Sequence, residues 1–208
     1  MYELIIIFWI FLGNIKFIED KKLNDNFIKI IHSIFSSLFA YKSLNGKLSI
    51  EFSCQFSRTY FICDTFNILI NRGLDYPYLL HHLCSIYILQ QMMIYDEIYR
   101  NIMMNGFIII EMSNLSIFTT YHLIKNNYNN YMIKLIQILW YGYFRINLLT
   151  QCLIEYNCLD TEYDLLYLNL WLVYFMGISW WIIQNYNFYK ENKIYEKLRN
   201  IKIKYLWK

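Results

Sequence analysis

Two adjacent histidines, His81 and His82, lie near the start of a long apolar run. Imidazole changes its charge close to physiological pH, so either side chain could act as a general base toward an amine or a hydroxyl. Neighbouring residues of an α-helix point about 100° apart, so one ring could face a cavity while the other contacts another helix. We therefore take His81 and His82 as candidate catalytic residues, with Asp64 as the carboxylate that would orient the base.

Asp64 belongs to a polar stripe within another apolar run. Tyr60, Asp64, Asn67 and Asn71 are spaced at i, i+4, i+7 and i+11. At 3.6 residues per turn these positions share one face of a helix. A polar face of this kind packs against other helices or water rather than against lipid. The stripe is therefore expected to line a cavity or a helix contact.

Further ionisable side chains occur in other apolar runs. Glu111 and Asn114 are three residues apart and share a helix face. His32 lies in the second run, and Arg145 lies in the sixth. An ionisable group at the centre of a bilayer costs on the order of 2.5–3.5 kcal/mol. We expect each group to be paired or to face a cavity, and Arg145 to neutralise either Asp64 or Glu111.

The apolar runs predict an all-α, polytopic membrane protein. Hydrophobic residues make up 57% of the 208 residues and aromatic residues 20%, against 17% charged residues. A soluble domain of this size cannot bury so much apolar surface. With one proline and six glycines, little interrupts a helix. Transmembrane helices are expected at residues 3–18, 27–44, 58–73, 78–96, 102–124, 132–153 and 164–187.

Basic residues are concentrated in the loops on one side of these spans and in the C-terminal tail, residues 188–208. Because basic loops stay in the cytosol, we expect a cytosolic C-terminus and a lumenal or external N-terminus. All four histidines would then lie in the cytosolic third of the membrane, with Asp64 and Glu111 deeper. These side chains would line a pocket that opens to the cytosol and narrows toward the middle of the bilayer.

Several other classes of site find no support in the sequence. The five cysteines show no C-x-x-C spacing, which argues against a zinc ribbon, a redox motif and a disulfide framework. No soluble basic module is visible, so nucleic acid is not an expected partner. The first segment lacks a basic leader and a small-residue cleavage site. Residues 1–26 are therefore interpreted as a retained transmembrane helix and a loop.

The order of polar and aromatic residues along the chain is informative in itself. These residues are His32-Ser33, Tyr60 with Asp64, His81-His82, Glu111 with Ser113 and Asn114, Phe144-Arg145, and Trp180-Trp181. The set resembles the TLC domain, a six-helix membrane domain named for translocation-associated, ceramide-synthase and neuronal-lipofuscinosis proteins. The resemblance covers residues 27–187, and the span at 3–18 would be an extra N-terminal helix.

The resemblance implies six helices around a central cavity that admits a lipid chain. In the ceramide synthases of this family, a histidine pair supports acyl transfer from acyl-CoA to a sphingoid base, and His81-His82 are the matching residues here. Those enzymes continue with a His-Asp and further aspartates where this chain has Glu111-Met112-Ser113-Asn114. The chain is therefore more similar to the family's TLC-domain-containing branch than to true ceramide synthases.

Three functions stay open at this point. The first is binding, sensing or trafficking of a membrane lipid, such as a sphingoid base or a fatty acyl chain. Its cavity would be lined by the polar network His32, Tyr60, Asn67, Glu111, Asn114 and Arg145. The alternative is a lipid acyltransferase that uses His81, His82 and Asp64, with acyl-CoA as co-substrate and no bound cofactor.

The third function is a metal-dependent lipid hydrolase, in which histidines and Asp64 would hold zinc. The spacing of these residues matches no zinc signature, so no metal is expected. Whether the protein is an enzyme is left open. The resemblance also implies the endoplasmic reticulum, or an internal membrane derived from it, as its location.

Overall fold

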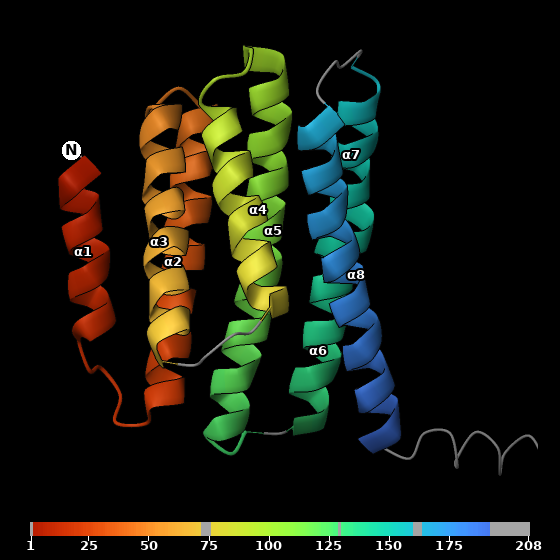
Figure 1. Cartoon of the computed structure of the whole chain (residues 1–208). Helices are drawn as coiled ribbons and strands as arrows, with labels where there is room; N and C mark the ends of the chain where they lie inside the picture. Colours follow the sequence, from red (N-terminus) through yellow and green to blue (C-terminus); the bar gives the residue numbers. More distant parts are fainter. Residues whose placement is uncertain (1, 72–75, 129, 160–163, 192–208) are drawn as a thin grey trace, which may run out of the picture.

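A computed structural model describes residues 2–71, 76–128, 130–159 and 164–191, and their regular structure is helical throughout (Figure 1). The elements are α1 (Tyr2–Asn14), α2 (Lys21–Leu44), α3 (Ile50–Asn71), α4 (Tyr76–Met92), α5 (Glu97–Lys125), α6 (Asn130–Gly142), the π-helix η1 (Tyr143–Leu148), α7 (Leu149–Asn157) and α8 (Asp164–Glu191). Because α6, η1 and α7 follow one another without a break, the described residues form seven helical rods. The predicted all-α class and the number of helices are confirmed.

The second helix begins earlier than its apolar run. It starts at Lys21 rather than at residue 27, because the Asp20 carboxylate accepts hydrogen bonds from the backbone N–H groups of Lys22 at 2.8 Å and Leu23 at 3.0 Å. These bonds satisfy amides that the first turn of a helix leaves open. The bond from Leu23, with the one from Lys22, holds the pKa of the Asp20 carboxyl below its ordinary value of 3.8.

The connection between α2 and α3 is also set by polar residues. Gly46 follows the end of α2 with a φ of 67°, a left-handed conformation that glycine adopts without strain. Ser49 precedes α3, and its hydroxyl accepts a hydrogen bond from the Phe52 N–H at 3.1 Å. The third helix therefore begins at Ile50 rather than at residue 58.

Most of the predicted basic tail, residues 192–208, lies outside the described residues.

Six of the rods form a closed ring. Along this ring α2 packs against α3, α3 against α4, α4 against α8, α8 against α6, α6 against α5, and α5 against α2. Sequential neighbours account for most of these contacts, whereas the pairs α4–α8 and α2–α5 join elements far apart in the chain. The ring therefore has an interior to which helices from both halves of the sequence contribute.

α1 lies outside the ring, beside α3, at the edge of the molecule in Figure 1. It buries Ile5, Trp9 and Leu12, which recur every three or four residues and so occupy one face of the helix. The Trp9 indole N–H donates a hydrogen bond to the carbonyl oxygen of Phe56 at 3.0 Å. This face and this bond fix α1 against α3.

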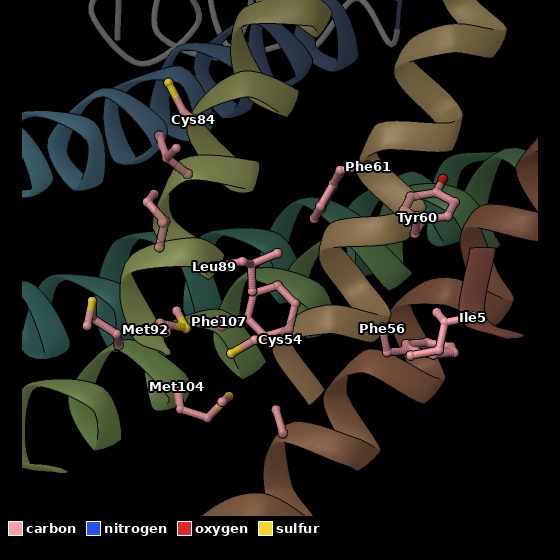
Figure 2. Close-up of a cluster of buried hydrophobic side chains, with 14 of the residues drawn as sticks. Ile5, Cys54, Phe56, Tyr60, Phe61, Cys84, Leu89, Met92, Met104 and Phe107 are labelled. Atoms are coloured by element: carbon pink, nitrogen blue, oxygen red, sulfur yellow. The ribbon is translucent and has the colours of Figure 1, made fainter. Parts of the chain in front are cut away.

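One half of the ring is closed by an apolar core. Leu89 and Met92 of α4 belong to the same buried cluster as Met104 and Phe107 of α5, and Figure 2 shows the four side chains together. Tyr156 at the end of α7 is 1% exposed and joins this cluster. The other half of the ring interior carries the polar residues.

Two of the described helices have the length and composition needed to cross a bilayer. They are Glu97–Lys125 and Leu165–Glu191, and α1 is apolar but shorter. Buried core helices of soluble proteins can satisfy the same two criteria, so insertion of the whole bundle in a membrane stays a prediction.

Candidate functional site

A cavity of about 670 Å³ lies inside the ring, and all six rods contribute to its wall. The structure brings most of the sequence-predicted residues to this cavity. They are His32, Tyr60, His81, His82, Glu111, Asn114 and Arg145. Residues separated by more than 100 positions thus line one shared cavity, in keeping with the ring arrangement.

The polar stripe of α3 does not face this cavity as a whole. Asp64 and Asn67 line a second cavity of about 340 Å³ between α1, α2 and α3, and Tyr60 lies at the wall of both. Asn67 therefore lies at the second cavity rather than the central one, because α1 packs over this face of α3. The Trp9 ring lies 4.9 Å from the Tyr60 ring, between their centroids.

His82 is held between two polar groups of α3. Its Nδ1 lies 3.0 Å from the Thr65 hydroxyl oxygen, and its Nε2 lies 3.7 Å from Oδ2 of Asp64. The hydroxyls of Tyr60 and Tyr78 each donate a long hydrogen bond of 3.5 Å to the same carboxylate oxygen. Asp64 thus lies beside Nε2 of His82 and approaches it from outside the central cavity.

The Thr65 hydroxyl fixes the tautomer of His82. It donates to the carbonyl oxygen of Phe61 at 2.6 Å, and a carbonyl can only accept. Since a hydroxyl has one proton, Nδ1 of His82 must be the donor in its contact with Thr65. In the neutral ring Nε2 then carries no hydrogen, and a proton taken up there would lie beside the Asp64 carboxylate.

His81 has a different environment. Its ring lies 5.9 Å from the His82 ring and 6.1 Å from the Phe61 ring, between centroids. Within the described part of the chain, no hydrogen bond holds either of its nitrogens. His82 is therefore the better oriented member of the pair, and His81 contributes an imidazole to the cavity wall.

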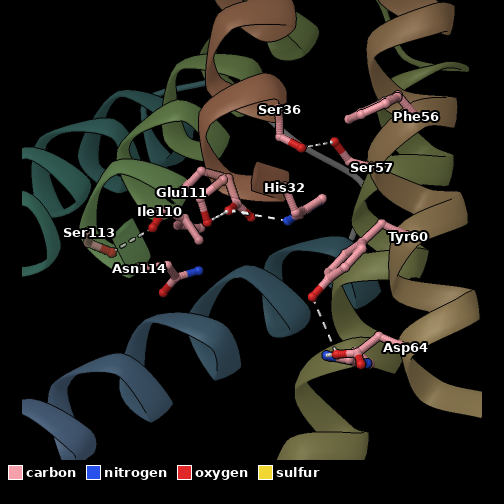
Figure 3. A network of polar contacts seen from close by, with 12 residues as sticks. His32, Ser36, Phe56, Ser57, Tyr60, Asp64, Ile110, Glu111, Ser113 and Asn114 are labelled. Carbon is pink, nitrogen blue, oxygen red and sulfur yellow. Dashed lines mark hydrogen bonds and ion pairs between the residues drawn. The ribbon is translucent and has the colours of Figure 1, made fainter. Parts of the chain in front are cut away.

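A second buried cluster surrounds the carboxylate of Glu111 (Figure 3). The Ser33 hydroxyl donates to Oε2 of Glu111 at 2.8 Å, and Nδ1 of His32 lies 3.7 Å from the same oxygen. The His32 ring stacks on the Tyr60 ring with centroids 3.7 Å apart. Glu111 is 1% exposed, so this cluster ties α5 to α2 deep inside the ring.

Arg145 is buried without a carboxylate beside it. Its Nε donates to the Ser113 hydroxyl at 2.8 Å and its Nη2 to Oδ1 of Asn114 at 3.2 Å. The expected neutralisation of Asp64 or Glu111 by Arg145 does not take the form of a direct ion pair in the described residues, because Glu111 is turned toward α2 and Asp64 toward His82.

The backbone around Arg145 is irregular. Arg145 lies within the π-helix η1, and such segments are frequent at functional sites. Opposite it, Gly177 of α8 leaves room for the side chain, since a Cβ at that position would come within 3.2 Å of Arg145 Cδ. The sequence predicted an ordinary helix over residues 132–153. That segment contains no proline that would have marked the distortion.

An apolar extension adjoins the polar cavity. It is a narrow space of about 50 Å³ that shares Phe61, Glu111 and Val173 with the wall of the larger one. The rest of its lining is almost entirely aliphatic, aromatic or sulfur-containing and includes Ile88, Leu89, Met92, Met103, Phe107, Leu149, Leu153 and Leu170. The interior of the ring therefore consists of a larger cavity with hydrogen-bonding side chains among apolar ones, here called the polar half, and a smaller apolar half.

Sequence reasoning missed three contributors to the site, namely Thr65, Tyr78 and Gly177. Thr65 follows Asp64 directly but carries no spacing signal. Tyr78 is four residues before His82, a helical interval that could have indicated a shared face.

In the described residues, no group of three or more His, Cys, Asp or Glu side chains is placed to hold a metal ion. Comparison with protein-family models, with curated proteins and with solved structures found no match to this chain. Function is therefore inferred from the geometry of the cavity.

Proposed function

We propose that this protein is a multi-pass membrane protein of the TLC-domain type that binds a lipid in the cavity within its six-helix ring, for sensing or trafficking. The observation that carries the proposal is that polar and ionisable side chains are buried between the helices while many large apolar side chains are exposed on their outer faces. A water-soluble bundle keeps its outer surface largely polar. An apolar outer surface around a partly polar interior suits a bundle that is surrounded by lipid.

α2 illustrates this inverted pattern. Its buried positions include Ser33 and Ser36, which are 1% and 0% exposed. Its outward positions include Ile34, Phe35 and Leu38, which are 41–46% exposed. Small polar residues between helices allow close packing and cross-helix hydrogen bonds within a membrane. The Ser57 hydroxyl of α3 makes such a bond to the Ser36 hydroxyl at 2.8 Å.

The outer faces of the rods on the opposite side of the ring are also apolar. Ile136 and Leu139 of α6 and Leu168 and Ile182 of α8 are each more than half exposed. Contiguous apolar patches of this kind mark interaction surfaces or membrane contact. Since the patches recur on rods around the ring, a lipid bilayer accounts for them better than one protein partner does.

The cavity fits a lipid in size and chemistry. Its volume of about 670 Å³ lies within the range of about 300–1,000 Å³ that is typical of small-molecule sites. The polar half offers hydrogen-bonding groups for a headgroup, and the apolar extension offers a path for a hydrocarbon chain. A cytosolic C-terminus and residence in the endoplasmic reticulum or a related membrane are part of the same proposal.

A pair of variants on α8 tests lipid binding. Met176 lines the cavity, whereas Leu168 on the same helix faces outward. A fluorescent single-chain lipid is titrated into the purified protein in mild detergent. Met176→Trp fills the cavity and should lower binding, while Leu168→Trp should leave it unchanged.

Equal binding to both variants, or absence of binding to the wild type, contradicts the proposal. A chain that leaves the membrane fraction in alkaline carbonate contradicts its membrane part.

A second candidate function, acyl transfer from acyl-CoA, is favoured by the orientation of His82. The amine or hydroxyl of an acceptor lipid would attack the thioester carbonyl while Nε2 of His82 takes its proton. The C–S bond then breaks, and His82 returns the proton to the departing CoA thiolate. Thr65 would keep the hydrogen on Nδ1, and the Asp64 carboxylate beside Nε2 would stabilise the ring once it is protonated.

The test is turnover of labelled acyl-CoA with sphingoid and lysolipid acceptors. His82→Ala should abolish turnover, and His122→Ala is the matched control because His122 does not line the cavity. Absence of turnover in the wild type with every acceptor, alongside retained lipid, excludes this candidate and leaves lipid binding in place.

A further inference from the structure

We propose that the lipid held in the cavity is acidic and that its anionic oxygens, from a carboxylate or a phosphate, pair with the guanidinium of Arg145. This inference rests on the proposed lipid-binding function and specifies the class of ligand. It starts from the charge and hydrogen-bond balance of one buried side chain.

The guanidinium of Arg145 has an unused donor group. The residue is 3% exposed, and its Nε and Nη2 donate to Ser113 and Asn114. Nη1 is buried and has no hydrogen-bond partner in the described part of the protein. An arginine side chain carries five N–H donors and keeps its charge inside proteins. A buried N–H group of this kind is costly unless an acceptor reaches it.

No carboxylate forms an ion pair with Arg145 in the described residues. Its contacts in the described residues are neutral, namely a hydroxyl, an amide oxygen and the ring of Tyr141, whose centroid lies 5.6 Å from the guanidinium carbon. Glu111 lies on the same helix as the two acceptors, but its Oε2 accepts from Ser33 and faces His32. A buried charge usually has an opposite charge beside it.

An anionic ligand can reach Arg145 from the cavity. Arg145 lines the cavity together with Asn114 and Gly177. Because Gly177 has no side chain, the guanidinium stem lies against the backbone of α8, where a Cβ would be 3.4 Å from Nε. The planar fork of arginine binds carboxylate and phosphate groups through two parallel hydrogen bonds. Arg145 therefore has the chemistry of an anion anchor and a place in the wall of the cavity.

The rest of the ligand is defined by the apolar extension. Val173 lies on α8 one turn from Gly177 and borders both spaces. A headgroup at Arg145 would thus leave its hydrocarbon chain pointing toward Leu89 and Met103, among aliphatic side chains. With a volume of only about 50 Å³, this extension has no room for two chains. The ligand class is a single-chain acidic lipid.

The experiment compares ligands that share a chain and differ in charge. Palmitic acid, a lysophosphatidic acid with the same chain, and hexadecanol compete for a fluorescent single-chain probe on the full-length protein in neutral detergent. We expect at least one of the two acids to bind about tenfold or more tightly than the alcohol. Preference for the fatty acid identifies a carboxylate ligand, and preference for the lysophosphatidic acid alone identifies a phosphate ligand.

Three variants assign the preference to Arg145. Arg145→Gln should remove it while hexadecanol binding persists, and Arg145→Lys should retain part of it because the charge remains. Arg58→Gln is the matched control, since Arg58 lies on α3 beside the Tyr2 ring and away from the cavity.

Equal binding of acids and alcohol by the wild type overturns the inference and leaves the proposed function standing. Because this comparison of ligands uses only the wild-type protein, its result does not depend on whether a variant folds. Retention of the preference in Arg145→Gln overturns it as well. Failure of the wild type to bind any of the three ligands overturns the proposed function itself.

Discussion

Gly142→Ala is the substitution for which the structure makes the sharpest stability prediction. Alanine is a better helix former than glycine, so a Gly→Ala change inside a helix ordinarily stabilises by about 1 kcal/mol. At Gly142, however, a Cβ would lie 2.8 Å from Nε1 and 3.2 Å from Cε2 of Trp181. The indole cannot simply rotate away, because its N–H donates to the carbonyl oxygen of Ile138 at 3.0 Å.

The expected magnitude follows from these opposing effects. Overpacking costs about 1–3 kcal/mol, and loss of a hydrogen bond costs about 0.5–1.5 kcal/mol. After the gain in helix propensity, Gly142→Ala should destabilise the protein by about 1–3 kcal/mol. For a chain of this size that corresponds to a melting temperature lower by about 2–12 °C. The contact matters for the site because it joins α6 to α8 three residues before Arg145.

Thermal unfolding in detergent, followed by circular dichroism, measures this effect. Gly106→Ala is the matched control, since its nearest neighbour would be Leu149 Cδ1 at an ordinary contact distance of 3.7 Å. That variant should melt at the wild-type temperature or about 2–4 °C above it. If Gly142→Ala were as stable as Gly106→Ala, the close approach of α6 and α8 would be refuted.

Two further pairs of variants probe the polar interior. Ser33→Ala removes the hydrogen bond to the buried Glu111 carboxylate and should lower the free energy of unfolding by about 1–3 kcal/mol. Ser37→Ala should be neutral or stabilising, since that buried hydroxyl has no partner in the described residues. Thr65→Val leaves the Nδ1–H of His82 without its acceptor and should lower the free energy of unfolding by about 1–3 kcal/mol. Thr59→Val should cost less, because its hydroxyl bonds only to a carbonyl oxygen of its own helix. Unfolding temperatures measure all four, and equal losses within either pair would contradict the assigned contacts.

Much of the helix arrangement could be predicted from the sequence. Each apolar run corresponds to one rod, because hydrophobicity over 15 or more residues with few glycines and one proline leaves little alternative to a helix. The starts were less predictable. At α2 and α3 they are set by the capping groups of Asp20 and Ser49, which lengthen each helix at its N-terminal end.

The sequence predicted most of the residues that line the cavity, but it did not predict which of them contact one another. Ionisable residues in apolar helices must face an interior, and this rule alone places His32, His82, Glu111 and Arg145 around one cavity. The partner of each depends on helix rotation and on packing between distant segments. Arg145 bonds to α5 through a π-helix whose extra residue per turn shifts its direction, and no pattern in the sequence encodes that shift.

The most direct test of lipid binding within the ring is native mass spectrometry of the protein purified from membranes. We predict a bound species with the mass of a single-chain acidic lipid, present on the wild type and on Leu168→Trp and lost from Met176→Trp. A wild-type protein that is folded, as judged by its helical circular dichroism, and that carries no lipid in any detergent would contradict the account.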